Sequence, residues 1–174
     1  MNEQENISAL EVALKNEMRE REFYLKNAER TKNSVGKAMF KQIADEELEH
    51  YKRLKEVHER WMKNEKWPET VPLKVNNTIV KNIFKDSIKS VDTMPEKDDD
   101  DLKAIQTAID FESKGVTHYA QLRDSVSDPK EKEFFNLLST IEHEHYLSLK
   151  DTEEYLTDPA SWYTKAEHHG LDGA

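Results

Sequence analysis

Residues 44–54 (ADEELEHYKRL) and residues 140–149 (TIEHEHYLSL) decide the fold of this chain. Each stretch holds a glutamate followed three residues later by a histidine: Glu47, His50, Glu142 and His145. Residues three apart share one face of an α-helix, so each pair projects from its helix in one direction. One such pair is weak evidence in a chain rich in Glu. Two pairs on two apolar helical seams predict a shared site.

An offset of 95 residues aligns the second half of the chain with the first half without a gap. Under this offset, residues 7–54 and 102–149 share eleven identities. Six of the eleven are acidic, histidine or tyrosine residues: Glu17, Tyr24, Glu47, Glu49, His50 and Tyr51. The chain therefore contains an internal duplication in which the chemistry repeats more clearly than the bulk sequence.

Four segments of the chain carry apolar residues at alternating steps of three and four, which is the pattern of amphipathic helices. They predict helices over residues 5–30, 36–63, 101–124 and 129–156. Residues 64–100 are too long for a tight bundle turn and predict one long crossover. Apolar residues from Ile79 to Val91 predict a short amphipathic helix within it. The fold class is therefore all-α, a four-helix bundle with pseudo-twofold symmetry.

The composition supports one helical domain over residues 1–174, because the chain has 36% charged and 36% apolar residues and only 4 Gly and 5 Pro. The tail, residues 157–174, is expected to be irregular, with Trp162 and Tyr163 docking it on this subunit or on a neighbouring one.

The net charge of −10 argues against nucleic-acid and membrane-surface partners. No apolar run approaches the length of a membrane span, and residues 1–10 do not resemble a signal peptide, so we expect a cytoplasmic protein. The absence of Cys excludes disulfides, thiolate zinc sites and iron–sulfur clusters. Any metal must be bound by Glu, Asp and His.

Glu17 and Glu112 occupy the seams of the other two predicted bundle helices, at the level of the two Glu-x-x-His pairs. Buried ionised carboxylates cost several kcal/mol each unless a counter-charge is present. Two divalent cations would neutralise the four carboxylates. One Glu from each of two helices plus a Glu-x-x-His pair from each of the others is the ligand set of di-iron and di-manganese bundles. Oxygen-rich ligands with one imidazole per metal suit iron or manganese better than structural zinc.

The segments EMREREFY, ADEELEHYKRL, ESKGVTHY and TIEHEHYLSL resemble the helix motifs of the rubrerythrin-like branch of the ferritin-like superfamily. The resemblance covers about residues 7–156 and implies a ferritin-like bundle that binds two iron ions, with manganese as an alternative. It implies that the iron ligands are Glu17, Glu47, His50, Glu112, Glu142 and His145. In this arrangement Glu47 and Glu142 bridge the metals, and the two histidines are terminal ligands.

Tyr24 and Tyr119 each follow a predicted ligand by seven residues. The resemblance implies that they hydrogen-bond the ligand carboxylates, and the alternative is that they are plain core aromatics. Rubrerythrins carry a further Glu one turn after the third-helix ligand, where this chain has Gly115. The symmetry-related position in the first helix is Glu20, which is either an additional ligand from the opposite side or a surface residue.

The resemblance implies a non-haem di-iron oxidoreductase that reduces hydrogen peroxide or dioxygen. Rubrerythrins proper carry a rubredoxin module with four cysteines, which this sequence lacks, so the electrons must come from an external donor such as rubredoxin. We expect a homodimer. The alternatives are ferritin-type iron oxidation and storage, which needs a large closed shell, and a non-catalytic bundle that uses metal for stability or sensing.

Overall fold

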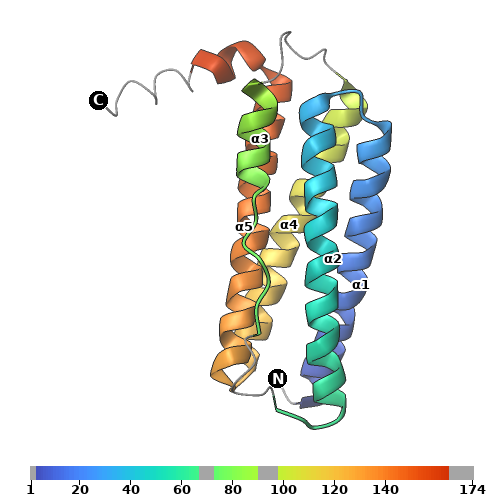
Figure 1. Cartoon of the computed structure of the whole chain (residues 1–174), viewed down its shortest axis with the longest axis vertical. Coiled ribbons are helices and arrows are strands. Elements are labelled where there is room, and N and C mark those ends of the chain that lie inside the picture. Colours follow the sequence, from blue (N-terminus) through green and yellow to red (C-terminus); the bar gives the residue numbers. More distant parts are fainter. Residues whose placement is uncertain (1–2, 67–72, 90–97, 165–174) are drawn as a thin grey trace, which may run out of the picture.

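The computed structural model describes residues 3–66, 73–89 and 98–164. Its helices are α1 (Glu3–Arg30), α2 (Ser34–Met62), α3 (Val80–Lys89), α4 (Asp99–Ser125) and α5 (Pro129–Thr157). The predicted all-α bundle is confirmed, because α1 packs on α2 and α4 packs on α5 as two antiparallel hairpins that face each other (Figure 1). The observed ends of these four helices lie within two residues of the predicted ends.

Capping side chains set the starts of three bundle helices. Asn33 Oδ1 accepts a hydrogen bond from the Gly36 backbone N–H at 2.9 Å and begins α2. Asp98 caps α4, and Asp128 caps α5 with Pro129 in its first turn. A capping side chain satisfies N–H groups that have no partner within the helix, and Pro lacks the N–H that would go unused there.

Two apolar clusters fill the bundle and leave a polar layer between them. The first apolar cluster includes Tyr24, Val35, Met39, Phe40, Ile43, Ile105, Ala108, Leu149 and Tyr155. The second includes Leu10, Leu54, Val57, Tyr119, Leu122, Phe134, Phe135 and Leu138. On each bundle helix, the predicted ligands fall between the residues of one cluster and those of the other. The apolar clusters therefore keep this layer away from both ends of the bundle.

The crossover covers one side of the bundle, where α3 packs against α2 and α5 (Figure 1). Val80, Phe84 and Ile88 are the buried residues of α3, and they belong to the first apolar cluster. Leu73 and Val75, which precede α3, are buried in the second cluster. The short amphipathic helix predicted in the crossover is therefore present, although Val91 lies outside the described residues.

The prediction of an irregular tail is wrong for residues 159–164, which are helical. Asp158 Oδ1 accepts a hydrogen bond from the Ser161 backbone N–H at 3.0 Å, so Asp158 starts this turn as Asp128 starts α5. The Trp162 ring lies 5.7 Å from the Phe84 ring and docks the turn on its own subunit. Residues 165–174 lie outside the described part of the chain.

Candidate metal centre

The six predicted ligands meet in the layer between the apolar clusters. They form two overlapping sets of potential metal ligands, here called donor groups: Glu17, Glu47, His50 and Glu142 in one, and Glu47, Glu112, Glu142 and His145 in the other. In each group, one donor atom per residue lies within 4.8 Å of the others. All six residues are at most 2% exposed. Glu47 and Glu142 belong to both groups, which is the geometry that bridging ligands require.

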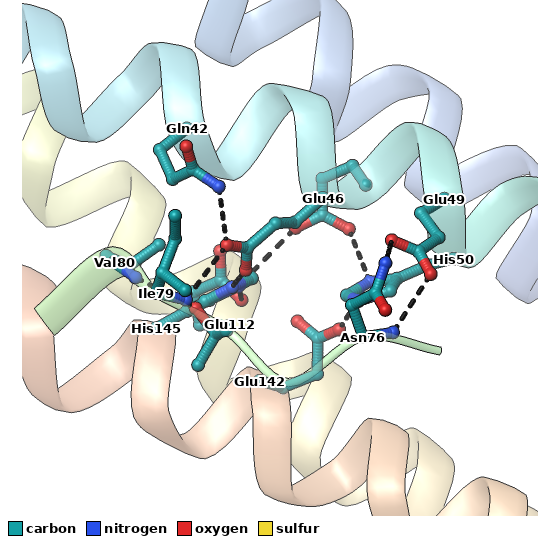
Figure 2. A network of polar contacts seen from close by, with 12 residues as sticks. Gln42, Glu46, Glu49, His50, Asn76, Ile79, Val80, Glu112, Glu142 and His145 are labelled. Atoms are coloured by element: carbon teal, nitrogen blue, oxygen red, sulfur yellow. Dashed lines mark hydrogen bonds and ion pairs between the residues drawn. The ribbon is translucent and has the colours of Figure 1, made fainter. Parts of the chain in front are cut away.

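The two histidines approach the acids through the same ring nitrogen. His50 Nδ1 lies 3.1 Å from Glu47 Oε2 and 3.3 Å from Glu142 Oε1. His145 Nδ1 lies 3.4 Å from Glu112 Oε2 and 3.6 Å from Glu47 Oε1. The rings are nearly parallel, with centroids 6.1 Å apart. Each ring therefore presents its Nδ1 atom to the acids of its own donor group (Figure 2).

The tyrosines hold carboxylates on the opposite hairpin. The Tyr24 hydroxyl on α1 donates to Glu112 on α4, and the Tyr119 hydroxyl on α4 donates to Glu17 on α1. Burial raises the pKa of both tyrosines, and the charge of the bonded glutamate adds to the effect. The hydroxyls therefore remain protonated donors. This geometry matches the role that the resemblance implies and differs from that of a plain core aromatic residue.

Burial and mutual repulsion make the ionised acids costly. Burial raises the pKa of Glu17 and that of Glu142 well above the ordinary value for a glutamate. The charge of Glu47 raises both pKa values further. Burial would raise the pKa of Glu47 too, but the charge of His50 and the close contacts of Glu47 with both histidines outweigh it and lower this pKa. The layer therefore retains protons that a bound cation would displace.

Several atoms of this layer that could bind a metal are buried and have no hydrogen-bond partner. They are Glu17 Oε2, Glu47 Oε1, Glu112 Oε2, Glu142 Oε1 and His145 Nδ1. A buried polar atom without a partner costs about 1–3 kcal/mol. All five atoms are carboxylate oxygens or an imidazole nitrogen, the donors that suit iron and manganese. The residues therefore fit a divalent metal centre.

Glu20 lies at the edge of this centre. Its side chain lines a cavity of about 240 Å³ between α1 and α4, together with Glu17, Gly115 and Tyr119. Burial, followed by the charges of nearby acids, raises the pKa of Glu20 to about 8. Glu20 belongs to neither group of clustered donors. It is thus not a plain surface residue, and the structure does not bring it into either ligand group.

Gly115 leaves space for the Glu142 side chain, which the sequence alone did not reveal. A Cβ atom at this position would lie 3.1 Å from Glu142 Oε2 and 3.2 Å from Glu142 Cγ. These separations are tighter than ordinary van der Waals contacts, so Glu142 would have to move. The glycine therefore lets Glu142 lie directly against α4.

Sequence reasoning missed Glu46, whose Oε2 lies 2.6 Å from His145 Nε2. Burial would raise the pKa of Glu46, but its hydrogen bond with His145 outweighs burial and lowers it. The duplication gives no signal for this residue, because the equivalent position is Ile141. The contact joins α2 to α5 and appears only when the two hairpins are assembled.

The fold and the buried Glu and His groups define a carboxylate metal-binding protein with a ferritin-like bundle. The family model described as Rubrerythrin matches residues 8–153, so the chain belongs to the rubrerythrin family. No curated protein and no solved structure matches the chain. In the described part of the chain, every helix is too short or too polar to span a membrane.

Proposed function

We propose that this protein is a non-haem di-iron oxidoreductase that reduces hydrogen peroxide, or alternatively dioxygen, with electrons from an external donor. The observation that carries the proposal is the pair of buried donor groups that share Glu47 and Glu142. Shared carboxylates hold two cations close together, and the four acids balance the charge of two divalent ions. Membership of the rubrerythrin family supports iron as the metal.

When bound, a pair of iron ions supplies the two electrons that cleave an O–O bond. The protein supplies orientation and protons. Tyr24 and Tyr119 each hold one oxygen of a ligand carboxylate, so the other oxygen points into the layer. The cavity between α1 and α4 reaches Glu17 and provides a route for a small oxidant. The Glu20 carboxyl group in its wall holds a proton that water formation requires.

The electron donor must be a separate protein or cofactor, because this sequence has no Cys and therefore no iron–sulfur module. A rubredoxin with its reductase is the donor that the proposal favours. We also propose that the protein works as a homodimer rather than as a large closed shell, because peroxide reduction needs no mineral cavity.

Anaerobic stopped-flow spectroscopy of the Fe²⁺-loaded protein tests the proposal. We expect rapid oxidation by hydrogen peroxide, slower oxidation by dioxygen, and repeated turnover when rubredoxin and its reductase are added. The Glu112→Ala variant should lose this reaction because it lacks a buried ligand. Glu144→Ala is the matched control, because Glu144 is half-buried and belongs to neither donor group.

Two outcomes would replace the proposal with another function. Retention of many oxidised irons per chain in a large assembly would indicate ferritin-type storage. Tight metal binding without reaction toward either oxidant would indicate a structural or sensing role. Native mass spectrometry and metal analysis of the same samples distinguish these outcomes.

A further inference from the structure

We propose that Glu46 is a positioning residue for His145 that makes the two metal positions chemically unequal. The inference rests on the proposed metal centre, and it concerns the order and affinity of metal binding rather than the reaction with oxidants.

The Glu46 carboxylate is held from three directions. Its Oε2 lies 2.6 Å from His145 Nε2, and the contact reaches across from α2 to α5 (Figure 2). Its Oε1 accepts hydrogen bonds from Gln42 Nε2 at 2.8 Å and from the Ile79 backbone N–H at 3.2 Å. The Glu46 side chain is only 13% exposed. Because the carboxylate is fixed in this way, it also fixes the orientation of the ring that it contacts.

The contact decides which nitrogen of His145 can bind a metal. An ionised carboxylate only accepts hydrogen bonds, so Nε2 carries a proton. Nδ1 is then the ring nitrogen that faces Glu47 and Glu112, at 3.6 Å and 3.4 Å, and a metal that displaces its proton would bind there. A carboxylate behind a metal-binding histidine fixes the ring tautomer and raises the basicity of the ligand nitrogen. Glu46 therefore prepares His145, before any metal arrives, as a strong ligand.

The other metal position lacks this support. The duplicated counterpart of Glu46 is Ile141, a buried apolar residue. Among the described residues, every ion pair of His50 is made by Nδ1, the nitrogen that faces the acids. Each donor group otherwise contains three glutamates and one histidine. The difference between the groups thus lies behind the histidines, and the position that includes His145 should bind metal more tightly.

Glu49 provides a matched control on the same helix. Its carboxylate accepts hydrogen bonds from the Asn76 backbone N–H and from Asn76 Nδ2, both at 2.9 Å (Figure 2). Glu46 and Glu49 both accept hydrogen bonds from the segment before α3. Of the two, only Glu46 contacts His145. A substitution at Glu49 loosens this segment without changing the support of the histidine.

Titration of the metal-free full chain with Co²⁺, followed by visible absorption and calorimetry, tests the inference. For the wild type we expect a tight step and a weaker step. Glu46→Gln should weaken the tight step by about 10- to 100-fold, the usual effect of removing such a partner. Glu49→Gln should leave both steps unchanged. In the Zn²⁺-loaded protein, the Nε2 proton resonance of His145 should shift in Glu46→Gln and stay in place in Glu49→Gln.

Two equal binding steps in the wild type would overturn the inference without the use of any variant. Equal weakening by Glu46→Gln and Glu49→Gln would also overturn it, because loss of the crossover contact would then be the cause. Neither result bears on oxidant reduction, since Co²⁺ and Zn²⁺ binding is measured without an oxidant. Failure of the wild type to bind metal at all would overturn both proposals.

Discussion

Replacing Glu142 with Gln should remove about half of the metal-dependent stability while leaving the metal-free protein intact. Glu142 is 1% exposed, belongs to both donor groups, and has one carboxylate oxygen without a hydrogen-bond partner. In the metal-free protein, burial and the charges of Glu47 and Glu112 raise its pKa. An uncharged Gln of the same shape therefore removes an unfavourable ionisation, so metal-free Glu142→Gln should melt at the same temperature as the wild type or higher.

The expected magnitude follows from mass action. A metal at one hundred times its dissociation constant stabilises the folded state by about 2.7 kcal/mol per site. For a domain of this size, each kcal/mol raises the melting temperature by about 2–4 °C, so each site contributes roughly 5–11 °C. A tenfold loss of affinity removes about 1.4 kcal/mol of this effect per site. Because Glu142 is shared, both sites should lose it.

Thermal melts followed by circular dichroism, in chelator and across a Mn²⁺ titration, measure the effect. The wild type should gain melting temperature with metal, and Glu142→Gln should gain much less. Glu144→Gln, two residues away on α5 and in neither group, should behave as the wild type. The reasoning is refuted if Glu142→Gln retains the full metal-dependent gain, or if the metal-free wild type is as stable as the metal-loaded one.

Three further predictions follow from the same layer. Tyr119→Phe removes the hydrogen bond to Glu17 and should weaken metal binding about 10- to 100-fold, measured by Mn²⁺ titration; an unchanged affinity would mean that the hydroxyl does not orient the ligand. Gly115→Ala should weaken metal binding because its Cβ crowds Glu142, and Gly115→Glu should weaken it as well rather than add a ligand; crystal structures and titrations of both variants would check this. The pKa values of Glu17 and Glu142 in the folded protein lie above the ordinary 4.5. Their contribution to stability is therefore complete below about pH 4.5, and it is lost as the pH rises through the raised pKa values. The metal-free protein should therefore melt at a lower temperature at about pH 8 than at about pH 5, and a flat profile in chelator would contradict the assigned burial costs.

Much of the centre was predictable because its residues follow local rules. Glu47 and His50 are three residues apart on one helix, so their common direction is a property of the helix itself. The duplication then identified Glu142 and His145 as an equivalent pair, and placed Glu17 and Glu112 at the same level. The tail was mispredicted, although Asp158 and Pro159 repeat the Asp-Pro pattern that begins α5 at Asp128 and Pro129.

The sequence by itself determined the helices, the crossover and the two Glu-x-x-His pairs, because periodicity and capping depend on neighbours within a few residues. Only the tertiary structure decided which groups meet across the bundle. Tyr24 bonds Glu112 and Tyr119 bonds Glu17 across the two hairpins. Glu46 reaches His145 although its duplicated counterpart is Ile141. Such contacts depend on the distance and rotation between packed helices, which spacing along one chain does not specify.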